Sequence, residues 1–308
     1  MDSRKRAQQL LLGAVTAVLL ACGSRTGLSS IGALGSDVRA NVVSDAAAQA
    51  GGRACPPIYL IDDTNTLLTF QPLAGAFTVV GTISCVPSGA PVTAFATDDA
   101  GTGYLIYGSG TQVSEIRVDM ATAVCTLLGT MLLPRPLING LSFAGSAAAG
   151  TERLYVLVAD ATSIVALESV VLPAWNPQPI GPLVSPIGLN VGASGNGGFI
   201  QLMGTTDGSL FALASEPPPA PDYEVLSVET KSGRVQRSAW TARSPGTPFE
   251  THVPTASALC GSTLFVFAVD PEASSTVAVS VPMGEQPPIA FATIEKKVVL
   301  AAGPPTFE

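Results

Sequence analysis

Residues 58–83 read IYLIDDTNTLLTFQPLAGAFTVVGTI and indicate how the whole chain is built. Two short runs rich in apolar and β-branched residues, 58–61 and 67–70, are separated by Asp and Asn, residue types that form tight turns. A third such run covers residues 77–83. The stretch therefore predicts three antiparallel strands connected by two turns.

The same unit returns along the chain with a period of about 50 residues, which is typical of radial or solenoid repeats. No amphipathic helix of ordinary length separates the units, so we expect an all-β fold, and four-stranded blades around an axis fit best. The first strand of the unit, at residues 58–61, recurs as YLIYG (104–108), RLYVLVAD (153–160), SLFALA (209–214) and TLFVFAVD (263–270).

The last hairpin of the unit also repeats, because residues 118–130 align without gaps over residues 70–82, and residues 228–235 fit the same frame. One turn position in this hairpin is expected to need a positive φ, which glycine adopts at least cost. The residues that coincide there are Gly75, Ala123 and Gly233.

An innermost strand is predicted ahead of each later unit, at residues 92–99, 138–145, 199–206 and 254–261. The first unit lacks such a strand, and residues 294–303 at the end of the chain supply a candidate. We therefore expect an all-β domain over residues 55–303 followed by a tail, 304–308. The expected architecture is a β-propeller of five four-stranded blades closed by the C-terminal strand. Six or seven blades, or a β-sandwich, are the alternatives.

Composition limits the classes of partner. The chain has 308 residues, of which 47% are hydrophobic and only 12% charged, and its formal net charge is −8. Nucleic-acid binding requires clustered Lys and Arg to neutralise phosphates. The sequence therefore predicts no nucleic-acid partner.

Residues 1–22 have the order of an export signal, with basic residues at positions 4–6 followed by the apolar run 10–20, which is too short for an ordinary membrane span. Leu19-Leu20-Ala21-Cys22 then resembles the lipobox of bacterial lipoproteins. This resemblance implies that Cys22 is diacylated and becomes the mature N-terminus. Cleavage by an ordinary signal peptidase, giving a secreted protein, is the alternative.

Residue 23 is Gly, whereas Asp at this position favours inner-membrane retention in lipoproteins of two-membrane bacteria, so the resemblance implies an outer-membrane lipoprotein facing the periplasm or the cell surface. Residues 23–54 are small, polar and aperiodic, which is typical of a disordered tether. The membrane, through the N-terminal lipid, is therefore an expected partner.

Three features together resemble a group of uncharacterised lipoproteins common in myxobacteria, which look like small β-propellers. They are the lipobox, strands such as RLYVLVAD (153–160), and a closing VVLAAG strand (298–303). The resemblance covers residues 55–303 and implies no established activity. Such chains often carry a final Cys after the closing strand, whereas this chain ends in GPPTFE.

Four cysteines besides Cys22 occur, and an even number in an exported protein predicts two disulfides with three possible pairings. Cys85 follows the outer strand of the first unit, and Cys125 opens the outer strand of the second. Adjacent blades bring their outer edges together, and similar chains carry Cys at both places, which implies a Cys85–Cys125 disulfide and leaves Cys55 with Cys260. Four free thiols are the alternative.

Four aspartates, Asp62, Asp63, Asp160 and Asp270, end the second strands of their blades and are predicted to share one face of the propeller. Such carboxylates could hold calcium or supply the acid and base of glycoside hydrolysis. The alternative is that each Asp only caps its own turn.

No catalytic pattern accompanies these carboxylates. The only histidine, His252, lies in a Pro-flanked linker, and GASGNGG (192–198) does not match the GxSxG nucleophile motif. With no CxxC pair and a single His, the sequence does not indicate a zinc site. It predicts no cofactor. The sequence therefore favours a non-catalytic, lipid-anchored binding or protein-interaction module of the cell envelope, with an unknown envelope protein or glycan as ligand. The alternative is an envelope glycan or peptide hydrolase or lyase that uses the carboxylates of one face.

Overall fold

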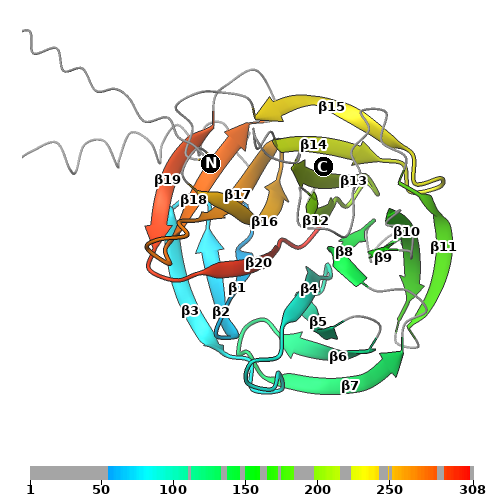
Figure 1. Ribbon diagram of the computed structural model, residues 1–308, viewed down its shortest axis with the longest axis horizontal. Coiled ribbons are helices and arrows are strands. Elements are labelled where there is room, and N and C mark those ends of the chain that lie inside the picture. Colours follow the sequence, from blue (N-terminus) through cyan, green and yellow to red (C-terminus); the bar gives the residue numbers. More distant parts are fainter. Residues whose placement is uncertain are drawn as a thin grey trace, which may run out of the picture.

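The computed structural model confirms the predicted architecture, because twenty strands form five four-stranded antiparallel sheets arranged as blades around one axis (Figure 1). It describes residues 55–109, 112–132, 137–145, 150–159, 165–172, 175–183, 198–215, 223–242, 249, 252–282 and 288–305. The predicted signal segment 1–22 and tether 23–54 lie outside these residues. Within them, no helix is long and apolar enough to cross a membrane.

In each blade, four strands follow one another from the central channel outward to the rim. Blade 1 contains β20 (Val298–Ala302), β1 (Ile58–Asp62), β2 (Thr66–Gln71) and β3 (Ala76–Thr82). Blade 2 contains β4 (Val92–Thr97), β5 (Thr102–Ser109), β6 (Gln112–Asp119) and β7 (Cys125–Leu132). Blade 3 contains β8 (Leu137–Ala144), β9 (Arg153–Ala159), β10 (Val165–Val171) and β11 (Asn176–Pro182).

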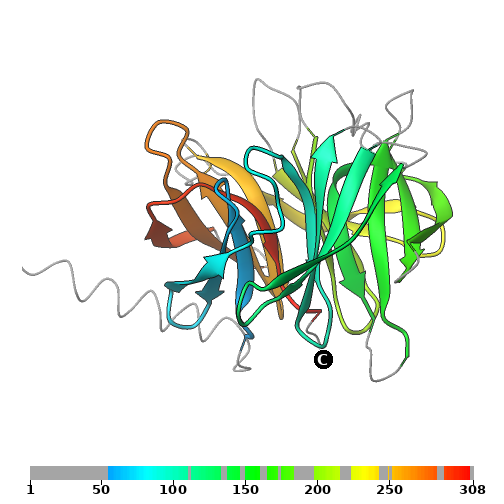
Figure 2. The same cartoon turned by 90° about the horizontal axis from the view of Figure 1, so that it is seen from below.

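The remaining two blades follow the same order. Blade 4 contains β12 (Gly198–Gly204), β13 (Leu210–Ser215), β14 (Tyr223–Val228) and β15 (Val235–Ala242). Blade 5 contains β16 (Val253–Cys260), β17 (Thr263–Val269), β18 (Thr276–Pro282) and β19 (Ile289–Ile294). The side view shows the innermost strands running along the axis (Figure 2).

Ring closure occurs through the C-terminal strand, as the sequence predicts. β20 pairs antiparallel with β1, so that Leu60 lies opposite Ala301 and Ile61 opposite Leu300. The strand begins at Val298 rather than at residue 294, because Ile294 still belongs to β19 and residues 295–297 turn the chain inward. The buried side chains of β20 pack against both neighbouring blades.

The outer hairpins contain the repeated turn that the sequence indicates. Gly75, Ala123 and Gly233 have φ values of 59°, 59° and 73°, which confirms the expected left-handed position. Each of these turns lies at the start of an outer strand. The turn of blade 4 lies so close to the preceding blade that a Cβ on Gly181 would come within 2.5 Å of the Ser232 carbonyl oxygen. Glycine at that place therefore permits adjacent blades to meet.

Two disulfides join blades rather than strands within a blade. Cys85, after β3, bonds Cys125 at the start of β7, and Cys55, before β1, bonds Cys260 at the end of β16. These are the pairings expected from the sequence. Blade 1, which is assembled from both ends of the domain, is thus covalently connected to blade 2 on one side and to blade 5 on the other.

Candidate functional site

The up-and-down order of strands gives the propeller two different faces. The connector face carries the segments between blades and the turns that join second and third strands, and the turn face carries the other two turns of each blade. Asp62 is the last residue of β1, Asp63 follows it, and Asp270 follows β17, so all three lie on the connector face. Asp160, the fourth predicted carboxylate, lies outside the described residues.

Asp62 is a buried structural carboxylate. Its Oδ1 accepts hydrogen bonds from the backbone nitrogens of Thr64 (2.9 Å) and Thr66 (2.8 Å), and its Oδ2 accepts one from the Lys296 ammonium at 2.5 Å. Burial acts to raise the pKa of Asp62, but the hydrogen bonds from Lys296, Thr66 and Thr64 outweigh it and hold the pKa below its ordinary value. Lys296 precedes β20, so this ion pair fastens the closing strand to blade 1.

The other two described carboxylates do not converge with Asp62. Asp63 is exposed, and its backbone nitrogen donates to the Lys297 carbonyl at 3.0 Å. The Asp270 carboxylate accepts from the backbone nitrogens of Glu272 and Ala273, and these bonds lower its pKa. Asp62 and Asp270 thus cap their own turns. Among the residues that the structure describes, no three His, Cys, Asp or Glu side chains form a group able to hold a metal ion.

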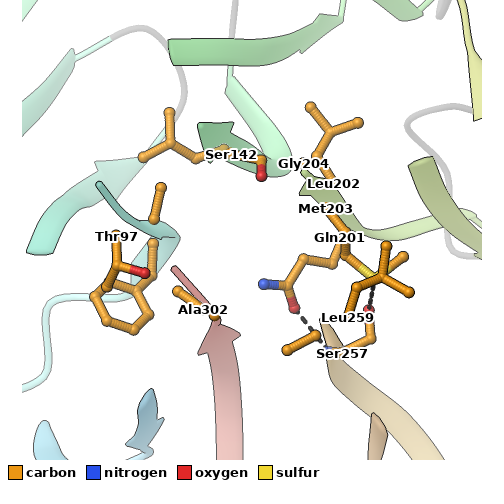
Figure 3. Close-up of a pocket in the computed structure, with 14 residues that line it drawn as sticks. Thr97, Ser142, Gln201, Leu202, Met203, Gly204, Ser257, Leu259 and Ala302 are labelled. Carbon is orange, nitrogen blue, oxygen red and sulfur yellow. Dashed lines mark hydrogen bonds between the residues drawn. The ribbon is translucent and has the colours of Figure 1, made fainter. Parts of the chain in front are cut away.

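Side chains of all five innermost strands converge instead in the central channel, toward the turn face (Figure 3). They surround a cavity of about 10 Å³, which is about the room that one ordered water needs. None of the described residues lining it is titratable. Its polar residues are Thr97, Ser142, Gln201 and Ser257.

Gln201 spans three blades across this channel. Its Oε1 accepts a hydrogen bond from the Ser257 backbone nitrogen at 2.8 Å, and its Nε2 donates to the Ala301 carbonyl. These partners lie on the innermost strands of blades 5 and 1. The amide therefore braces the channel beside the closing strand, and Figure 3 shows it directed toward Ser257.

Two hydroxyl groups that line the cavity differ in whether they form a hydrogen bond. Ser257 donates from its Oγ to the Met203 sulfur at 3.4 Å, whereas the fully buried Thr97 Oγ1 has no hydrogen-bond partner among the described atoms. The cavity that the described residues enclose has room for about one ordered water.

Glu115 is a second buried group that the sequence pattern did not single out. It lies on β6 with 2% of its surface exposed, and its Oε1 has no hydrogen-bond partner among the described atoms. Side chains alternate along a strand, so Glu115 shares a face with Val113, which packs in the core between blades 2 and 3. Burial raises the pKa of Glu115 to about 7.

A sequence signal existed for both Gln201 and Glu115, because each is a long polar residue inside an apolar strand, in FIQLM (199–203) and VSEIRV (113–118). Such residues are rarely buried without a specific partner or role. The strand-end aspartates stand out more strongly in the sequence because turn residues and ligands share the same chemistry.

No protein-family model and no curated protein matches this chain. Among solved structures, TolB from Acinetobacter baumannii is 12% identical, with 83% of this chain and 59% of that chain covered and a TM-score of 0.43. A glycoside hydrolase family 43 arabinoxylan arabinofuranohydrolase from Bacillus subtilis, solved with cellotetraose, is 14% identical, with 66% and 52% covered and a TM-score of 0.46.

A chain from a Nidogen/Laminin complex is 9% identical, with 80% of this chain and 97% of that chain covered and a TM-score of 0.44. The present chain spans just over half the length of the TolB and hydrolase chains. At these identities and TM-scores, the likenesses carry no argument about ligand or activity. The class that the structure itself defines is a five-bladed β-propeller with two inter-blade disulfides.

Proposed function

We propose that this protein is a lipid-anchored β-propeller of the cell envelope that acts as a non-catalytic binding or protein-interaction module. The observation that carries the proposal is the composition of the central channel, where the described lining has no titratable side chain and Gln201 is occupied in bracing the ring. General acid–base chemistry needs a titratable group positioned at the substrate.

The state of the carboxylates supports the same proposal. Asp62 is bound to Lys296, and Asp270 caps its own turn, so neither is poised as a paired acid and base. Propellers bind ligands or partners on loops held by a rigid ring, and two disulfides stiffen this one. An envelope protein or a glycan is the proposed class of ligand.

Acylation of Cys22 is the first testable part. Cells that express the wild-type chain with a palmitate analogue are expected to label it, whereas the Cys22→Ala variant should remain unlabelled, because the lipobox thiol is the acyl acceptor. Gel fluorescence after click coupling measures this. Equal labelling of the two proteins would contradict the anchor.

The binding role is tested separately by screening the purified protein against envelope glycans and proteins and against glycosidase and peptidase substrates. Saturable binding without turnover is expected. The non-catalytic assignment would be contradicted by turnover of one of these substrates. That turnover must recur in an independently purified preparation and be lost when a single carboxylate is substituted.

A further inference from the structure

The exposed large apolar side chains of this propeller are gathered on one part of its rim. Seven such residues occur among the described positions, and six of them lie on the outer hairpins of blades 1 and 2, the seventh being Val253. We name this group the apolar arc: Leu73, Val79, Val124, Leu127, Leu128 and Leu132, with exposed fractions from 38% to 79%.

The two halves of the arc are joined to each other. A Cβ on Gly81, at the end of β3, would lie 3.1 Å from the Ala123 Cβ in the turn before β7, and the Cys85–Cys125 disulfide connects the same two places. Figure 1 shows β3 and β7 following one another along the outside of the ring. The two outer hairpins that carry the arc are therefore held next to each other in a fixed arrangement.

The outer hairpin segments that carry the arc contain no charged residue although the protein is acidic, and the exposed Arg117 and Asp119 of β6 lie beside them. No Asp, Glu, Lys, Arg or His occurs in residues 64–97 or in residues 120–134, while the chain has a net charge of −8. An acidic protein is repelled by an anionic surface except where its own charge is low. Since Arg117 and Asp119 carry opposite charges, the net charge beside the arc is low, and this part of the rim can approach anionic lipid with little repulsion.

The chain outside the described residues joins the propeller in one of the two blades that carry the arc. It joins the propeller at Cys55, three residues before β1, in the blade that carries Leu73 and Val79. If Cys22 is acylated as proposed, a coil of the predicted tether's length would reach roughly 30 Å. Such tethering gives the rim a high effective concentration at the bilayer, so that even a weak contact is populated.

We propose that the apolar arc rests on the lipid surface to which the chain is anchored, an inference that depends on the proposed lipid anchor. β3 and β7 are outermost strands with unpaired backbone groups at their free edges, and such edges are not tolerated in hydrocarbon. The contact is therefore shallow: the side-chain tips enter the interface while water still solvates the strand edges.

The test uses the acylated full chain in vesicles of phosphatidylethanolamine and phosphatidylglycerol, with tryptophan as a depth probe. Leu127→Trp places the probe on the arc, and Gln236→Trp places a matched probe on an exposed position of β15 in blade 4. The wild type gives the background from Trp175 and Trp240. The expected result is a blue shift and quenching by shallow-brominated lipid at position 127 only, with weaker quenching by deep-brominated lipid.

The double variant Leu127→Trp/Leu132→Asp provides a second test. The added carboxylate should be repelled by phosphatidylglycerol, so lipid quenching of the tryptophan should be lost. Equal quenching at positions 127 and 236 in a vesicle-bound protein would overturn the arc contact alone. Failure of the protein to float with vesicles would refute the anchor and this proposal together. A blue shift that depends on protein concentration and occurs without lipid quenching would indicate that the arc contacts a second copy of the chain. That result would overturn the proposed lipid contact.

Discussion

At the residue scale, Glu115 is the described carboxyl group whose pKa burial displaces furthest. Its pKa is raised from 4.5 to about 7 because burial between blades 2 and 3 penalises the charged form. In the unfolded chain the same carboxyl ionises near its ordinary pKa. Folded protein therefore retains a proton that unfolded protein loses between these two values.

The consequence for stability follows from linkage. An acid whose folded pKa is raised contributes most below its unfolded pKa, and that contribution falls as pH rises toward the folded pKa. Over the interval from 4.5 to about 7 the loss is at most about 3 kcal/mol. Above pH 7 the charged carboxylate lies in an apolar interface, so the propeller is expected to be less stable there than at pH 5.

We predict that Glu115→Gln makes the protein more stable than wild type at pH 8 and flattens the dependence of stability on pH between 5 and 8. Urea unfolding at both pH values measures this. Glu272→Gln, at an exposed carboxylate, is the matched control and should leave the wild-type profile unchanged. If Glu115→Gln retained the wild-type pH dependence, the Glu115 carboxyl would not be the group that makes stability depend on pH.

The aspartates show why single residues are harder to interpret from the sequence than strands. Turn formation at Asp62 and Asp270 depends on residues within four positions, so the local sequence is enough to suggest it. The partner that decides the role of Asp62 is Lys296, which is 234 positions away. No local pattern relates two such residues until the ring has closed.

At the scale of elements, β20 is the strand on which closure depends. Val298 and Ala301 are completely buried, and Leu300 and Ala302 are nearly so. Burial of one Val or Leu side chain stabilises by about 1.5–3 kcal/mol, against a typical net stability of about 5–15 kcal/mol. Loss of β20 would also expose the inner edge of β1 to other strands.

Deletion of residues 294–308 is therefore expected to unfold or aggregate the domain. Deletion of residues 24–53, which precede the described domain, should leave the melting temperature nearly unchanged. Differential scanning fluorimetry and size-exclusion chromatography compare the two. A monomeric 294–308 deletion that melts within a few degrees of the full chain would show that closure does not depend on β20.

The strands can be predicted because each one has a local sequence pattern and that pattern recurs in several blades. The innermost strands and the hairpin turns each recur in several blades, so weak individual patterns support one another. The predicted start of β20 is wrong because IEKKVVLAAG runs continuously across the end of β19, a turn and β20, without Gly or Pro to mark the boundary. The bounds of the closing strand thus require knowledge of its pairing partner.

At the scale of the whole molecule, both disulfides attach the closing blade to its neighbours. In the chain-entropy model, closing loops of 205 and 40 residues stabilises by about 5 and about 4 kcal/mol. We predict that Cys55→Ser/Cys260→Ser and Cys85→Ser/Cys125→Ser each lower the denaturation midpoint, the first pair more strongly. Guanidinium unfolding measures the two shifts.

The control is the wild-type protein with both disulfides reduced. Its denaturation midpoint should fall by about the sum of the two shifts measured for the Cys→Ser variants. If the Cys55–Cys260 pair could be removed with no change in midpoint, packing, the Asp62–Lys296 pair and the hydrogen bonds of Val298 with Thr255 and Thr276 would be enough to hold blade 1 to blade 5.

The antiparallel pairing of β1 with β20 also sets the order of events when the protein forms. Residue 60 must find residue 301, so the most distant contact of the domain is the one that completes it. Contacts of long sequence separation slow folding, because a large loop must close before any stabilisation is gained. The propeller cannot be completed during synthesis while its last segment is still emerging from the ribosome. Until then the inner edge of β1 has no strand partner.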